Sequence, residues 1–169
     1  MYLALERYSR PNTVEECLRL LAETGQRAAL LSGGTQLNSS GHEELTHVID
    51  LQALPLGQVI VDGDTARLGS RLTLRQLRRA NALQGPLCTA LREAAAAYAN
   101  LAIQNRATLG GRIVVERPDQ DLPPALLALG ARLRLARLDG HALIEELVDY
   151  PVGAEARAEL RGALVTEVL

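Results

Sequence analysis

Phenylalanine and tryptophan are absent from this chain of 169 residues, and tyrosine occurs only four times. Proteins that bind single-stranded nucleic acid stack bases on aromatic side chains in a basic groove. This chain has few such side chains and a net charge of −2, so we expect no nucleic-acid partner. The apolar fraction is 47% and consists of Leu, Ala, Val and Ile for the most part, which is enough to fill an aliphatic core.

Cysteine is also scarce, with Cys17 and Cys88 far apart and neither in a Cys-x-x-Cys pair. This spacing encodes no zinc or iron–sulfur framework, so no metal site is predicted. Both thiols fall on apolar helical faces, which is typical of small buried residues in a reducing compartment. The sequence has no long apolar span and no signal peptide. We therefore expect a cytoplasmic protein without a membrane partner.

Residues 1–55 show the pattern of a β-α-β unit. Residues 2–8 alternate weakly and predict a short strand. Thr13 and Glu16 form a capping box for a helix that ends at Gly25. Apolar strands are then predicted at 28–31 and 48–51.

Residues 56–169 read as a mostly antiparallel sheet with helices. Asp62-Gly63-Asp64 marks a hairpin, Thr73 and Pro86 open helices, and Asp121 is a cap for a third. Further strands are predicted at 113–115, 131–138, 143–147 and 164–169, with a polar helix at 155–161. The predicted fold class is α+β, with subdomains 1–55 and 56–169.

Two Gly-Gly doublets, Gly33-Gly34 and Gly110-Gly111, each stand close to a threonine at the end of an apolar run. Glycine allows φ > 0 and close approach of another molecule, and successive N–H groups in such a turn form a nest for anionic oxygen. Each doublet alone is more typical of an ordinary turn. Neither is a GxGxxG or Walker A sequence. Together they suggest a diphosphate held between two loops.

Three segments resemble the flavin-binding domain of the molybdenum hydroxylases, the family of carbon monoxide dehydrogenase medium subunits. Residues 32–37, Ser-Gly-Gly-Thr-Gln-Leu, are similar to its Ala-Gly-Gly-Thr-Asp-Leu loop. Residues 103–113 are similar to its Ile-Arg-Asn-x-Ala-Thr-Leu-Gly-Gly-Asn-Ile segment, and residues 120–129 to its Ala-Asp-Leu-Pro-Pro pattern. The resemblance covers almost the whole chain and implies a two-subdomain flavin-binding fold.

The resemblance implies FAD as cofactor and no catalytic side chain, because the flavin carries the chemistry. It implies an oxidoreductase subunit that takes electrons from a molybdenum-cofactor subunit through an iron–sulfur subunit and passes them to an external acceptor. The alternative is a flavin-free structural or assembly module that keeps the fold. The cofactor-binding residues implied are Ser32, Gly33, Gly34, Thr35, Gln36, Leu37, Asn105, Thr108, Gly110, Gly111, Arg112 and Asp121.

Three positions depart from the family pattern: Gln36, Gln104 and Arg112. The Arg112 guanidinium either pairs with the diphosphate or fills the groove as a plug. The family's C-terminal domain is expected to be absent, since the chain ends at Leu169. An exposed isoalloxazine ring and weak FAD binding are then expected.

Two further groups of residues are predicted to lie on the surface. His42, His47 and His141 are isolated in the sequence and are interpreted as surface or loop residues. Arg75, Arg78 and Arg79 share one helix, which is typical of a solvated face, and a partner subunit could also use it.

Overall fold

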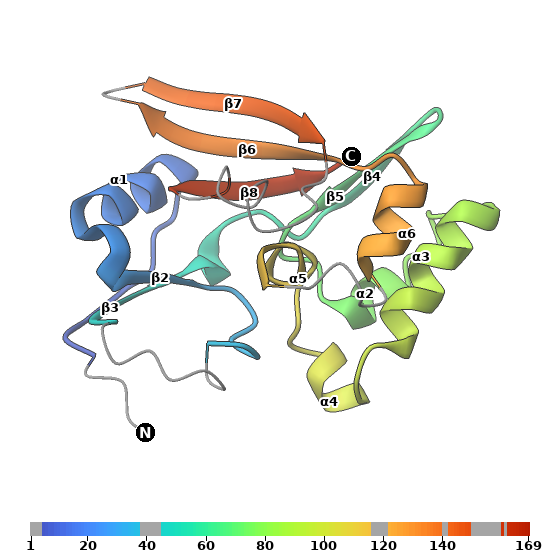
Figure 1. The fold of residues 1–169 in the computed structure, drawn as a ribbon, viewed down its shortest axis with the longest axis horizontal. Coiled ribbons are helices and arrows are strands. Elements are labelled where there is room, and N and C mark those ends of the chain that lie inside the picture. The colour runs from blue at the N-terminus through green and yellow to red at the C-terminus, as the bar shows by residue number, and fades with distance from the viewer. Residues whose placement is uncertain (1–4, 38–44, 116–121, 140–141, 150–159, 161) are drawn as a thin grey trace.

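The computed structural model describes residues 5–37, 45–115, 122–139, 142–149, 160 and 162–169. Its strands are β1 (Arg7–Ser9), β2 (Ala28–Leu31), β3 (His47–Asp50), β4 (Val59–Asp62), β5 (Thr65–Gly69), β6 (Arg132–Asp139), β7 (Ala142–Asp149) and β8 (Ala163–Val168). Its α-helices are α1 (Val14–Thr24), α2 (Leu74–Arg78), α3 (Pro86–Ala97), α4 (Leu101–Gln104), α5 (Leu109–Val115) and α6 (Leu122–Ala128), and 3₁₀ turns cover Gly25–Arg27 and Leu51–Ala53. Figure 1 shows two sheets, with α5 between them and the remaining second-half helices on one side.

The N-terminal unit is a parallel three-stranded sheet in the order β1-β3-β2, which confirms the predicted β-α-β pattern. The Thr13 hydroxyl accepts a hydrogen bond from the Glu16 N–H at 3.1 Å and so begins α1. The Glu16 carboxylate accepts a hydrogen bond from the Asn12 N–H at 2.8 Å. A capping box would use the N–H of Thr13, one residue later. The first strand begins later than predicted, because the pairing with β3 starts at Arg7.

The second sheet is antiparallel in the order β4-β5-β8-β6-β7, so the α+β class is confirmed. The predicted strand at 113–115 is wrong, since these residues form the end of helix α5. A β-branched run favours a strand, but Thr108 provides a helix-starting hydroxyl, which accepts from the Gly111 N–H at 3.3 Å. Residues 155–159 and Asp121 lie outside the described residues.

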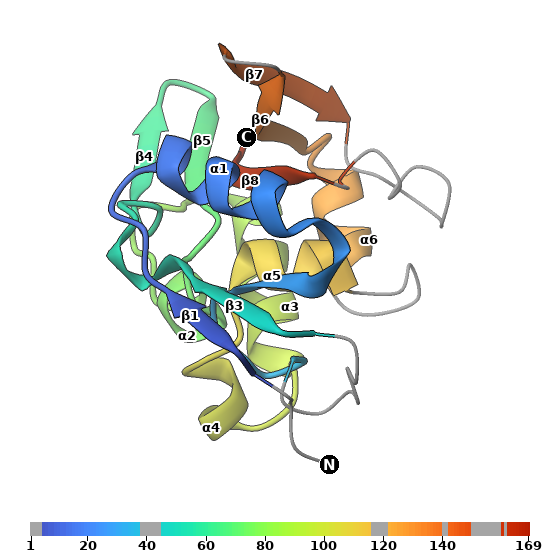
Figure 2. The same ribbon diagram turned by 90° about the vertical axis from the view of Figure 1, so that its left-hand side faces the viewer.

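Helix α1 lies between the two sheets, as Figure 2 shows. Its Cys17 and Leu18 pack in one apolar cluster with Ile49 of β3, Ala136 of β6 and Leu164 of β8. A larger cluster joins the helices of the second half to β5, β6 and β8. The first cluster contains residues from both sides of the predicted boundary at residue 55, so the core does not divide there. The division into subdomains 1–55 and 56–169 therefore stays a prediction. This packing fixes the end of β2 opposite β8 and α5.

Two of the buried side chains in the N-terminal unit, His47 and Cys17, have shifted pKa values. His47 is 1% exposed, so its predicted surface position is wrong; its Nδ1 and Nε2 lie 2.8 Å and 2.9 Å from the hydroxyls of Thr24 and Ser9. Burial is the main reason that the pKa of His47 is lowered, with a smaller effect from Arg7. Burial also raises the pKa of the Cys17 thiol to about 11, as befits an unreactive core residue. No helix in the described part of the chain is long and apolar enough to cross a membrane.

Candidate functional site

The first glycine loop, residues 32–37, leaves the carboxyl end of the edge strand β2. Its two glycines serve different purposes. Gly34 has φ = 72°, a conformation that costs little only for glycine. Gly33 has no such angle, but a Cβ on it would lie 1.8 Å from the carbonyl oxygen of Arg106. The first doublet thus combines a left-handed turn with a close backbone contact.

Arg106 supports this loop from behind. Its Nε donates a hydrogen bond to the Gly33 carbonyl at 3.2 Å, and its own carbonyl touches the Gly33 backbone. The segment before the second doublet is therefore in direct contact with the first doublet. Sequence reasoning missed Arg106, although it lies inside the motif at residues 103–113, between Asn105 and Ala107.

The second doublet lies in the first turn of α5 rather than in an open loop. Neither Gly110 nor Gly111 has positive φ. The N–H groups of Leu109 and Gly110 donate to the carbonyls of Leu72 and Ser70, each at 2.8 Å. The expectation that these N–H groups point into a shared nest is therefore wrong, because protein acceptors already take them.

Close packing explains the glycines of the second doublet instead. A Cβ on Gly110 would lie 2.7 Å from the Cβ of Ser70, just beyond the end of β5. A Cβ on Gly111 would lie 2.9 Å from the Thr108 hydroxyl oxygen. The second doublet therefore lets α5 begin directly against the end of β5, with its first turn facing the glycine loop.

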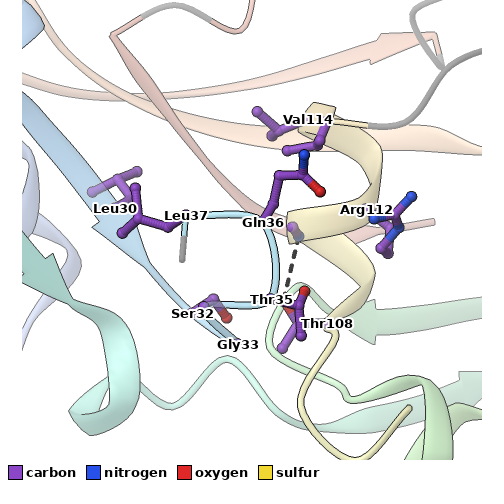
Figure 3. A pocket seen from close by; sticks show the side chains of 12 residues that line it. Leu30, Ser32, Gly33, Thr35, Gln36, Leu37, Thr108, Arg112 and Val114 are labelled. Carbon is purple, nitrogen blue, oxygen red and sulfur yellow. Dashed lines mark hydrogen bonds between the residues drawn. The ribbon is translucent and has the colours of Figure 1, made fainter. Parts of the chain in front are cut away.

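The glycine loop and α5 enclose a hollow of about 440 Å³, which we call the polar hollow (Figure 3). It is lined by Leu30, Ser32, Gly33, Gly34, Thr35, Gln36, Leu37, Thr108, Gly111, Arg112, Val114 and Val115. The structure thus brings together the predicted residues of both motifs. Among the described residues, no carboxylate lines the hollow. The side-chain oxygen of Ser32 is buried and has no hydrogen-bond partner among the described residues.

Two of the described predicted site residues, Gly110 and Asn105, do not line the polar hollow. Gly110 lines a neighbouring hollow described below. Asn105 is exposed, and its Oδ1 accepts a hydrogen bond from Arg75 at 2.8 Å. Asp121 lies outside the described residues. The structure therefore supports both glycine motifs at the polar hollow and leaves Asn105 outside it.

A second, apolar hollow of about 300 Å³ adjoins the first. Leu30, Ser32, Gly111, Val114 and Val115 line both. The walls that belong to the apolar hollow alone are Leu21, Ala28, Leu51, Ser70, Gly110, Leu160, Gly162, Ala163, Leu164 and Val165. Sequence reasoning missed Val114 and Val115 as site residues because the predicted strand gave no reason to place them beside the glycines. Because the two hollows share these five residues they lie side by side, and we refer to them together as the cavity.

Arg112 takes a role that neither sequence hypothesis anticipated. Its side chain is buried, and its guanidinium carbon lies 4.3 Å from the centre of the Tyr98 ring. In Figure 3 it lies on the other side of α5 from Leu30 and Leu37. The Nε2 of buried Gln104 donates to the carbonyls of Ala96 and Tyr98 at 3.0 Å and 2.9 Å. Two of the three departures from the family pattern, Gln104 and Arg112, therefore meet at the turn that ends α3.

This cavity is built for binding rather than for acid–base chemistry. The described residues that line it include no histidine, cysteine or carboxylate that could serve as a base or nucleophile. Among the residues that the structure describes, no group of three His, Cys, Asp or Glu could hold a metal ion. Hydroxyls, glycine backbone and aliphatic walls are the features it offers to a ligand with a polar centre and a flat apolar part.

Comparison with known proteins adds the following findings. Residues 3–169 match the family described as "FAD binding domain in molybdopterin dehydrogenase". The chain is 30% identical over 141 residues to the carbon monoxide dehydrogenase medium chain of Hydrogenophaga pseudoflava (81% of this chain, 49% of that protein). It is 28% identical over 130 residues to caffeine dehydrogenase subunit beta of Pseudomonas sp. (75% and 44%).

A structural relative agrees with these sequence relatives. The carbon monoxide dehydrogenase structure from Hydrogenophaga pseudoflava "which lacks the Mo-pyranopterin moiety of the molybdenum cofactor" superposes with a TM-score of 0.80 at 25% identity, covering 99% of this chain and 59% of that chain. The chain spans about half the length of the curated relatives it matches.

Proposed function

The chain belongs to the family of FAD-binding domains in molybdopterin dehydrogenases, and we propose that it carries the FAD of a multisubunit molybdenum hydroxylase. FAD is the cofactor that the family's description names. The observation that carries the proposal is the cavity in which the two family motifs meet. Residues 32–37 form one wall, and Thr108 with the first turn of α5 forms the other.

The residues present fit FAD on three counts. The buried Ser32 hydroxyl has no hydrogen-bond partner among the described residues and can bond to a phosphate or ribose oxygen. The left-handed backbone at Gly34 lets a phosphate approach the chain closely. The apolar hollow beyond Ser32 offers aliphatic walls to a flat ring system. The cavity as a whole therefore matches a ligand with a diphosphate next to a ring.

Within this proposal the protein binds and orients FAD, and the flavin supplies the redox chemistry. Ser32, Thr35 and Thr108 hold the diphosphate from the two walls with their hydroxyls, together with the backbone at Gly34. Because the Leu109 and Gly110 N–H groups already have protein acceptors, the glycine loop supplies the backbone donors. Val114 and Val115 exclude water from the side of the cavity formed by α5.

The partners follow from the names of the relatives, which are called "subunit" and "medium chain". We propose that a molybdenum-cofactor subunit oxidises the substrate, that an iron–sulfur subunit conducts the electrons, and that this chain hands them to an external acceptor. The hydroxylase families differ in substrate, and the cavity described here binds the cofactor rather than the substrate.

A titration of the purified protein with FAD tests the function. We expect flavin fluorescence to be quenched with saturation at one FAD per chain, and the visible absorption bands to shift on binding. Riboflavin, which lacks the diphosphate, is the matched control ligand and should bind far more weakly. A protein that takes up no FAD would contradict the proposal and favour the flavin-free structural module.

Arg112 should act on FAD binding through the position of α5. We expect Arg112→Asn to weaken FAD binding about five- to thirty-fold, equivalent to about 1–2 kcal/mol, because the cation–π contact and its buried packing are lost. If Arg112 instead plugs the groove, Arg112→Asn should strengthen FAD binding, because loss of the guanidinium opens the groove. The measurement is the FAD dissociation constant of parent and variant, with Arg112→Lys as the conservative variant that keeps the charge. Tighter binding by Arg112→Asn would establish the plug.

A further inference from the structure

Four arginines gather on one side of the molecule, away from the cofactor cavity. Arg75 and Arg78 belong to α2, Arg79 follows it, and Arg92 belongs to α3. They border an open hollow of about 660 Å³ together with Asn81 and Leu101, the first residue of α4. We call this set of four the arginine face. Figure 1 shows its helices α2, α3 and α4 on the far side of the molecule from α1.

Within the part of the chain that the structure describes, the arginine face has no carboxylate partner at ion-pair distance. Among the described residues, the ion pairs closer than 4.0 Å involve other arginines: Arg7, Arg19, Arg67 and Arg134. Two members of the face are instead oriented by neutral acceptors. Arg75 donates to the Asn105 side chain at 2.8 Å, and the Arg92 Nε donates to the Arg78 carbonyl at 3.0 Å. The guanidinium groups thus keep both their charge and spare N–H donors.

Leu101 distinguishes this face from an ordinary solvated surface. Its side chain is 52% exposed at the border of the same hollow. An apolar side chain among arginines is the composition of a protein interface, where arginine and large apolar residues are enriched. A nucleic-acid surface would offer aromatic rings for stacking, and none of the described residues that line this hollow is aromatic.

We propose that the arginine face is a docking surface for a protein partner that presents carboxylates around an apolar side chain. The carboxylates pair with the guanidinium groups in bidentate fashion, and the apolar side chain covers Leu101. This goes beyond FAD binding and does not depend on it. The arginine face is connected to the glycine loop through two neighbouring residues. Arg75 donates to the Asn105 side chain, and the next residue, Arg106, donates to the Gly33 carbonyl. A partner docked here is therefore placed beside the support of the glycine loop.

The experiment uses a fluorescent, doubly capped acidic peptide, Gly-Asp-Glu-Leu-Glu-Asp-Gly, and measures anisotropy at physiological salt. We expect saturable binding by the parent protein and at least a tenfold weaker affinity for the double variant Arg78→Glu/Arg79→Glu. Leu101→Ser should weaken binding about threefold or more. The control is Arg7→Glu/Arg19→Glu, which makes the same charge change elsewhere and should leave peptide affinity unchanged.

Three results would overturn the proposal. One is no saturable binding of the peptide by the parent, which would leave a solvated face. Another is equal loss of affinity in the control variant, which would indicate attraction by net charge alone. The third is tighter binding of a fifteen-nucleotide oligothymidylate than of the peptide, with loss in Arg78→Glu/Arg79→Glu. FAD uptake by Arg78→Glu/Arg79→Glu should equal that of the parent, which shows that the variant is folded and separates this test from that of FAD binding.

Discussion

Replacing Gly33 by alanine is expected to weaken FAD binding by roughly 100-fold or more, a loss of about 2.7 kcal/mol. The new Cβ would lie 1.8 Å from the Arg106 carbonyl oxygen, which is backbone and cannot rotate away. The glycine loop must therefore move off the residues that support it. That movement displaces Ser32 and Gly34, the two features of the loop that fit the diphosphate.

Gly57 provides a matched control for this substitution. A Cβ on Gly57 meets nothing within 4 Å, and its φ is not in the left-handed region. Gly57→Ala should thus bind FAD like the parent. Dissociation constants from fluorescence titration compare the two, and circular dichroism checks that both are folded. If Gly33→Ala bound FAD as tightly as Gly57→Ala, the contact between the two motifs would have no part in forming the site.

Gly34→Ala isolates the conformational contribution of the same doublet. At φ = 72° the left-handed backbone destabilises an L-residue by roughly 1–2 kcal/mol. Its effect on FAD binding should be smaller than that of Gly33→Ala, because strain alone leaves the loop where it is. Gly110→Val is a poorer probe, since a side chain there collides with Ser70 where α5 begins.

The fold was largely predictable because its signals are local. The Asp-Gly turn predicted the β4–β5 hairpin, and Thr73 begins α2 as predicted, with Gln76 completing a capping box. The segment at 113–115 was mispredicted for a reason that is not local. Its β-branched residues favour a strand, but the N–H groups of Leu109 and Gly110 find acceptors on residues 70 and 72, and the helix starts there.

The residues of the site were predictable from the sequence, but the contacts that bring them together were not. Both Gly-Gly doublets reach one cavity, yet only Gly34 has the positive φ that the pattern suggested. The other glycines serve close contacts between segments far apart in the sequence, which no local pattern encodes. The same holds for Arg112, whose partner Tyr98 is set by the packing of α5 against the end of α3.

Glu167 is the residue whose loss should most reduce the stability of the second sheet. It is 5% exposed on β8, the strand between β5 and β6. Its carboxylate accepts two hydrogen bonds from Arg67 of β5, at 2.9 Å and 3.2 Å, and one from Arg134 of β6 at 2.6 Å. One buried acid thus links three strands. Just beyond β5, the Ser70 carbonyl accepts the Gly110 N–H of α5, so the same strands support one wall of the cofactor cavity.

We expect Glu167→Ala to lower the free energy of unfolding by about 2–3 kcal/mol, and the melting temperature by roughly 4–12 °C. The value lies below the usual range for breaking a buried pair, because the Arg67 and Arg134 side chains are 40% and 26% exposed and regain water. Urea unfolding of parent and variant measures the difference, and Arg19→Ala, which removes an exposed pair with Glu15, is the control and should cost under about 0.5 kcal/mol. Replacing all three charges, as in Arg67→Met/Arg134→Met/Glu167→Leu, should recover most of the loss, because neither arginine then remains without the Glu167 carboxylate. A Glu167→Ala protein as stable as Arg19→Ala would show that the pairing of β5, β8 and β6 stands without the carboxylate.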